Sequence, residues 1–154
     1  MNKYHYIECG LDNVYISGLQ FQLDDAGDEI FTIPAINQLH KLIASGIVQH
    51  EHGISGDELR FLRTEMGLTQ HELAQFVHHD KQTIGRWERG EFPIDSKAEA
   101  LIRRIAIEKL KLDVNLGIEE LSKKSVPAAK SQQINIQLEN DNSHPNYELL
   151  ALAA

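Results

Sequence analysis

The spacing of hydrophobic and polar residues changes along the first third of the chain. Over residues 1–33, β-forming residues alternate with turn residues, and the longest break is the acidic run 24–28. This pattern predicts short strands joined by turns. Apolar residues then recur at helical spacing, which predicts a helix over about 34–45 that stops near Gly46. Residues 50–53 are expected to form a linker.

The block 55–112 carries one helix-start signal three times. In a capping box, a hydroxyl residue caps the first turn and a glutamate three positions later accepts a hydrogen bond from the cap residue's backbone N–H. The spacing occurs at Ser55–Glu58, Thr69–Glu72 and Ser96–Glu99, each followed by apolar residues with a helical period. The block therefore predicts a group of short helices.

Between the second and third of these boxes, the chain predicts one more helix. Asp80 is the expected N-cap, and Gly90 is the expected stop. Ile84 and Trp87 are expected to face the core. Helical geometry then leaves an outward surface made of Lys81, Gln82, Gly85, Arg86 and Arg89.

After Gly117 the pattern weakens. Residues 118–123 predict a helical turn or two, and alternation over 133–138 predicts one strand. An apolar tail covers 147–154. A lone strand needs a partner, which is either the N-terminal sheet or another subunit.

The runs 68–77 and 81–90 resemble the phage-repressor family of helix-turn-helix proteins, the Cro/CI or Xre-type regulators. The shared features are the Thr-Gln helix start, Glu-Leu-Ala inside that helix, and Trp-Glu-x-Gly at the end of the next. One departure is His78-His79, where the family usually has a glycine and an apolar residue. The resemblance implies a five-helix bundle whose third helix enters the major groove of DNA.

The resemblance also implies roles for individual residues. Base contacts are expected from Lys81, Gln82 and Arg86, since glutamine can pair with adenine and arginine with guanine. Phosphate contacts are expected from Thr69, Gln70, Thr83 and Arg89, with Gln70 at a helix N-terminus that favours an anion. Arg63 and Glu88 are expected to form an ion pair that docks two helices, which is a structural role.

The charge distribution modifies this picture without reversing it. The chain has a net charge of −8, yet residues 55–112 contain ten acidic and ten basic residues. The acidic excess lies in residues 1–54 and 113–154. Salt screens charges beyond about 8 Å, so a docked duplex senses mainly the local field. We expect the acidic flanks to weaken non-specific DNA binding.

Composition limits the remaining functions. A chain with 42% hydrophobic and 25% charged residues is typical of a globular protein. The sequence has neither the layout of a signal peptide nor an apolar run long enough for a membrane span, so we expect a cytoplasmic protein with no membrane partner. Cys9, as the single cysteine, predicts no internal disulfide.

Metal binding and catalysis find little support. His50, His52 and Cys9 are candidate ligands, but structural zinc needs four ligands in paired spacings and no Cys-x-x-Cys occurs. We expect no metal, no cofactor and no enzymatic activity. The layout is similar to MqsA-type antitoxins, which carry two Cys-x-x-Cys pairs where this chain has only Cys9.

We therefore expect a mainly α protein with three parts. Residues 1–54 form a small α+β portion, 55–112 a helix-turn-helix bundle, and 113–154 a C-terminal strand and tail. The expected function is repression or autoregulation by a homodimer on palindromic double-stranded DNA. The alternative is an antitoxin that also neutralises a toxin protein. The homodimer is expected to form through the region after Ser96, unless the strand and tail fold back on their own subunit.

Overall fold

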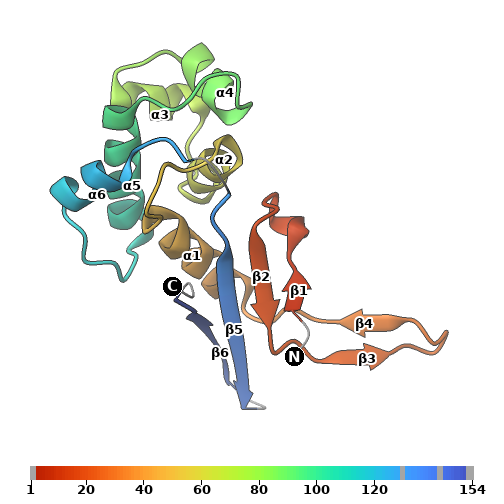
Figure 1. Ribbon diagram of the computed structural model, residues 1–154. Helices are drawn as coiled ribbons and strands as arrows, with labels where there is room; N and C mark the ends of the chain where they lie inside the picture. The colour runs from red at the N-terminus through yellow and green to blue at the C-terminus, as the bar shows by residue number, and fades with distance from the viewer. Residues whose placement is uncertain (1–2, 129–130, 142–143, 152–154) are drawn as a thin grey trace.

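A computed structural model describes residues 3–128, 131–141 and 144–151 of the 154-residue chain. A group of helices occupies one end and a β-sheet the other (Figure 1). The helices are α1 (Ile36–Val48), α2 (Gly56–Glu65), α3 (Gln70–Val77), α4 (Lys81–Glu88), α5 (Ser96–Leu110) and α6 (Ile118–Lys124). The strands are β1 (Lys3–His5), β2 (Val14–Ser17), β3 (Phe21–Leu23), β4 (Glu29–Phe31), β5 (Ile134–Asp141) and β6 (His144–Leu149).

The two ends of the chain build one four-stranded sheet, in the order β1-β2-β5-β6. β2 and β5 are parallel, with Val14 opposite Ile134 and Ile16 opposite Ile136, and all four side chains are buried. Helix α1 packs against β5 and β6. The strand predicted near residue 134 therefore folds back on its own chain, which was one of the two alternatives. Residues 147–149 of the predicted tail belong to β6.

The expected five-helix bundle is matched only in part. Residues 55–112 are described throughout and contain four helices, α2 to α5. Helices α1 and α6 come from outside this block, and both pack against α5. The reason is the apolar surface of α5, which buries Ala98, Ile102, Ala106 and Ile107 and needs neighbours on more than one side.

Two of the three predicted capping boxes are confirmed, at Ser55 and at Thr69. The third is wrong. Helix α5 is capped by Asp95, whose Oδ2 accepts a hydrogen bond from the Ala98 N–H at 3.1 Å. Aspartate caps at least as well as serine, and the glutamate of the expected box turns into the core instead.

The predicted end of α1 is also wrong, because the helix continues through Gly46 to Val48. Gly46 is buried against β5, where an added Cβ would lie 3.1 Å from a side-chain carbon of Ile134. The glycine therefore allows close packing of helix on sheet, and it does not terminate the helix.

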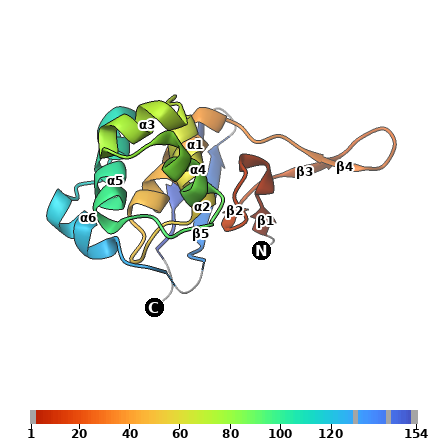
Figure 2. The same ribbon diagram turned by 90° about the horizontal axis from the view of Figure 1, so that it is seen from above.

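Strands β3 and β4 form a separate two-stranded hairpin that extends away from the rest of the molecule (Figure 2). None of the helices in the described ranges is long and apolar enough to cross a membrane.

Candidate nucleic-acid interface

Helices α3 and α4 are held in a fixed relation by the short turn between them. His78 ends α3 with φ of 58°, in the left-handed region that usually favours glycine. Asp80 then caps α4 as predicted, with its Oδ1 2.7 Å from the backbone nitrogen of Thr83. The ring of His79 packs edge-on against Trp87 at 4.9 Å between centroids. The two histidines thus occupy the positions where the sequence departs from the family pattern.

The two sides of α4 differ as the sequence predicted. Ile84 and Trp87 are buried in the helical core, while Lys81, Gln82 and Arg86 are exposed. Gly85 was expected to face outward and is instead buried, because Gln70 and Arg89 close over it. The exposed side of α4 therefore presents one amide and two cationic groups within two turns of helix.

Glu88, at the end of α4, is the centre of the contact between α2, α3 and α4. Arg63 of α2 donates from Nε to Glu88 Oε2 at 2.6 Å and from Nη2 to Oε1 at 3.0 Å. Gln70 of α3 donates to Oε1 at 3.2 Å, and Arg60 Nε lies 3.5 Å from the same oxygen. Burial alone would raise the pKa of Glu88, but these donors outweigh it and hold the pKa below its usual range. The charged carboxylate is thus a shared acceptor for side chains of α2 and α3, and it orients α4.

The four residues expected to contact phosphate have different surroundings. Thr69 caps α3 with its side-chain oxygen, and Thr83 donates its hydroxyl to Asp80 Oδ1 at 2.8 Å. Gln70 is oriented by Glu88, as described above. Arg89 pairs with Glu91 at 2.7 Å on the surface, so a phosphate would have to compete with that carboxylate.

The start of α2 lies directly against the end of α4. A Cβ added at Gly56 would lie 2.6 Å from the carbonyl oxygen of Glu88, and it would also collide with the carbonyl of Trp87. Only glycine permits this close approach of two backbones. The contact, together with Glu88, fixes the angle at which α4 leaves the bundle.

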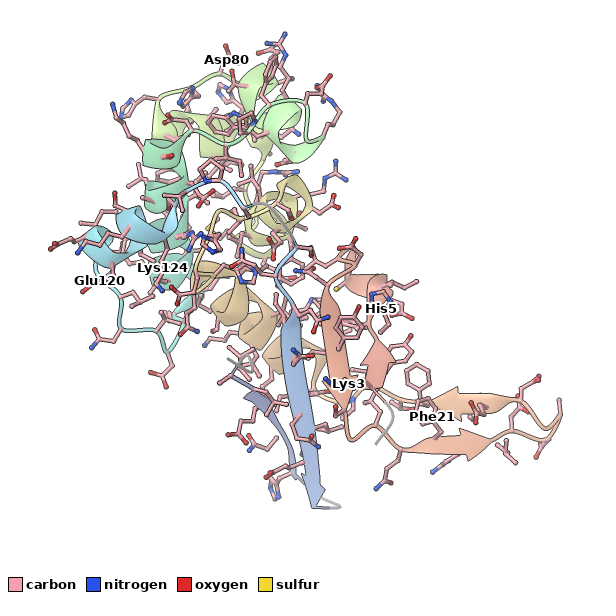
Figure 3. All side chains as sticks on the ribbon, in the orientation of Figure 1. Lys3, His5, Phe21, Asp80, Glu120 and Lys124 are labelled. Carbon is pink, nitrogen blue, oxygen red and sulfur yellow. The ribbon has the colours of Figure 1, made fainter. Side chains whose placement is uncertain are left out.

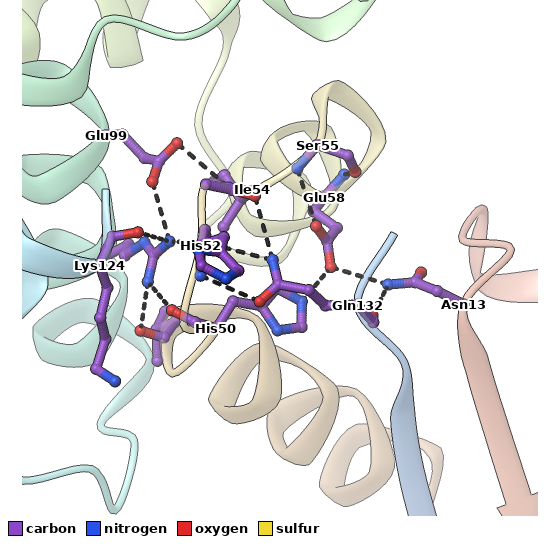
Figure 4. Close-up of polar contacts among 12 residues, drawn as sticks. Asn13, His50, His52, Ile54, Ser55, Glu58, Glu99, Lys124 and Gln132 are labelled. Carbon is purple, nitrogen blue, oxygen red and sulfur yellow. Dashed lines mark hydrogen bonds and ion pairs between the residues drawn. The ribbon is translucent and has the colours of Figure 1, made fainter. Parts of the chain in front are cut away.

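A buried polar network joins the helices to the sheet, and the sequence interpretation missed it (Figure 4). Arg103 of α5 is fully buried. Its two Nη nitrogens donate to Glu99 Oε2 at 3.0 Å and to backbone carbonyls of Val48, His50, His52 and Lys124. Burial raises the pKa of Glu99 more than Arg103 lowers it. An arginine among the apolar positions of α5 was the signal that could have pointed to this network.

The second half of the network surrounds Glu58. His50 Nε2 lies 2.6 Å from Glu58 Oε2, and Asn13 Nδ2 donates to the same oxygen at 3.0 Å. Burial alone would raise the pKa of Glu58, yet hydrogen bonds from His50, Ser55 and Asn13 bring it below its usual range. The segment expected to be a plain linker thus ties α2 to the sheet.

Two of the candidate metal ligands, His50 and Cys9, make other contacts. His50 belongs to the network, and Cys9 Sγ donates to the Tyr6 carbonyl at 3.2 Å. Burial raises the pKa of the Cys9 thiol. Across the described ranges, no group of three or more His, Cys, Asp or Glu side chains is placed to hold a metal ion.

Comparison with known proteins identifies one segment. The helix-turn-helix family model matches residues 59–106, which run from α2 to α5. No curated protein and no solved structure matches the chain. The match confirms the resemblance to phage-repressor-like regulators that the runs 68–77 and 81–90 indicated. Residues 59–106 are therefore a helix-turn-helix DNA-binding domain of the Cro/CI or Xre type.

Proposed function

We propose that the protein is a repressor or autoregulator that reads operator DNA with α4 in the major groove. The observation that carries this proposal is the exposed group of Lys81, Gln82 and Arg86 on a helix whose other side is anchored by Ile84, Trp87 and Glu88. A rigid helix with amide and guanidinium groups on its free face suits the edges of adenine and guanine. Thr69, Gln70, Thr83 and Arg89 flank this face and supply phosphate contacts.

Replacing Arg86 with alanine is expected to weaken binding to the selected operator by about 1–3 kcal/mol and to relax preference at one base pair, because a bidentate base contact is lost. Gln70→Ala is expected to weaken binding to all DNA sequences about equally. Selection from a random DNA library, followed by titrations, measures both effects. Lys123→Ala, a change of an exposed lysine on α6, is the control. An unchanged base preference for Arg86→Ala would remove Arg86 from the base-reading set.

The protein is proposed to act as a homodimer on palindromic sites, since one recognition helix touches too few base pairs for genomic specificity. β5 is paired on both sides within its own sheet, so the dimer cannot form by adding a strand of the second copy to β5. We expect sedimentation to show a dimer on a palindrome, with half-sites about 34 Å apart or a multiple of that. A monomer that binds one half-site as tightly as the palindrome would contradict this.

The second candidate function is that of an antitoxin, which represses its own operon and also binds a toxin protein. The acidic, partly apolar hairpin of β3 and β4 favours it, because this element lies apart from α4 and has protein-binding character. A small toxic protein encoded beside this gene would distinguish the antitoxin from a simple repressor.

A further inference from the structure

The hairpin of β3 and β4 is fixed at its base and projects at its tip. Phe31 packs edge-on against Tyr4 of β1 at 4.5 Å and against Phe21 at 5.0 Å between ring centroids. Beyond this aromatic cluster the hairpin leaves the body of the protein (Figures 1 and 2). We refer to residues 20–32 as the arm.

The arm exposes large apolar side chains on both faces. Phe21 is 43% exposed, Leu23 is 70% exposed and Ile30 is 48% exposed. The strand register places Phe21 and Leu23 on one face and Ile30 on the other. Two strands alone are marginally stable in water, so a projecting hairpin with this much apolar surface is typical of an interaction element.

A hollow of about 220 Å³ beside the arm is lined by Ile30 and Phe31 of the arm and by Leu138 of β5. Gln20 and Gln22 contribute amide groups to its wall. Its size suits one or two side chains of a partner, which would be held by apolar contact and oriented by the amides.

The tip of the arm is a fixed cluster of negative charge. Residues 24–29 include four acidic residues, and residues 18–33 contain no lysine, arginine or histidine. Asp24 Oδ1 accepts hydrogen bonds from the backbone nitrogens of Ala26 at 2.9 Å and Asp28 at 2.8 Å, which hold the turn in shape. Such a surface repels DNA phosphates. A two-fold contact between arms would place the acidic tips of two copies against each other, and their negative charges repel.

We propose that the arm is the docking site for a protein partner with a basic surface. Phe21 and Leu23 pack into an apolar groove of this partner, while the acidic tip faces lysine and arginine side chains on the groove's rim. Phe21 lies at the opposite end of the molecule from Asp80, the cap of α4 (Figure 3). The protein can therefore hold the partner and DNA together. This inference deepens the antitoxin candidate and does not depend on operator binding.

Site-specific photo-crosslinking in cells of the source organism tests the proposal. The photoreactive residue p-benzoylphenylalanine is placed at Leu23 of the full chain and, as a matched control, at Ile118 of α6, which is 53% exposed. Mass spectrometry identifies the adducts. We expect a partner of net positive charge that crosslinks at Leu23 and not at Ile118.

The identified partner is then purified and titrated with two charge-reversed variants of the full chain. Asp25→Lys with Asp28→Lys is expected to weaken binding at least about tenfold at low salt, since close interfacial charges contribute over 1.4 kcal/mol. Asp113→Lys with Glu119→Lys changes the net charge equally at other exposed positions, and it should leave the affinity within about twofold. Operator affinity, measured on the same samples, should be alike for both variants.

Three results would overturn the proposal. They are an adduct at Leu23 formed only between two copies of this chain, no adduct at Leu23 beyond that at Ile118, and equal partner affinity for the two charge-reversed variants. A chain that binds the basic partner through the arm but binds no operator would instead refute the DNA-reading proposal and leave this one standing.

Discussion

Arg103→Ala is expected to lower the free energy of unfolding by about 3–5 kcal/mol. The substitution leaves the Glu99 carboxylate buried beside an empty space, and it removes the donor from four backbone carbonyls. Those carbonyls belong to the end of α1, to residues 50 and 52, and to the end of α6. A single side chain therefore joins three segments to α5.

Chemical denaturation of the purified protein measures this loss. Arg104→Ala is the matched control, because Arg104 is the next residue of α5, is partly exposed, and donates to one carbonyl, that of Leu116. Its expected cost is about 0–1 kcal/mol. Arg104 also pairs with Glu108 on the surface at 3.5 Å. Equal losses of unfolding free energy for the two variants would show that the buried network adds no more than these surface contacts.

Glu88→Ala is expected to lower the free energy of unfolding by about 2–4 kcal/mol at pH 7. Arg63 loses both hydrogen bonds to its carboxylate partner, and Gln70 loses an acceptor. The change should also weaken operator binding, since Glu88 orients both α4 and Gln70. Glu88→Gln keeps the shape and one acceptor oxygen while it removes the charge. Its free energy of unfolding is expected to lie between those of the wild type and Glu88→Ala.

The cost of Glu88→Ala should depend on pH. The pKa of Glu88 is lower in the folded protein than its ordinary value of 4.5, so its charge stabilises the fold above that value. The stabilisation is lost as pH falls through the folded pKa. The difference between wild type and variant, measured by denaturation, should therefore shrink from pH 7 to about pH 3. A difference that is constant over this range would mean that the interaction is not ionic.

Much of the DNA-binding domain could be predicted because its signals are local. The caps at Ser55, Thr69 and Asp80 act on backbone groups within three residues, so their hydrogen bonds form almost irrespective of the rest of the chain. The burial of Ile84 and Trp87 followed from helical period alone. The outward placement of Lys81, Gln82 and Arg86 is the geometric consequence.

Other features of the site depended on packing between elements. Gly85 is buried because side chains from α3 and from the end of α4 cover it. The Glu88 carboxylate accepts hydrogen bonds from Gln70 and Arg60 in addition to Arg63. No spacing in the chain predicts these two additional contacts. The third capping box was wrong for the same reason: Glu99 gains more from Arg103 and the Ile54 N–H in the core than from a cap at the surface.

The architecture outside the helix-turn-helix was decided by contacts between distant parts of the chain. Sequence alternation identified a strand near residue 134, but its parallel pairing with β2 joins residues about 120 positions apart. Gly46 reads locally as a helix stop, and only the closeness of β5 explains why the helix continues. Capping hydrogen bonds that form within one helical turn can therefore be predicted from the sequence. The choice of strand partner and the burial of Arg103 become defined only when tertiary packing removes water from those groups.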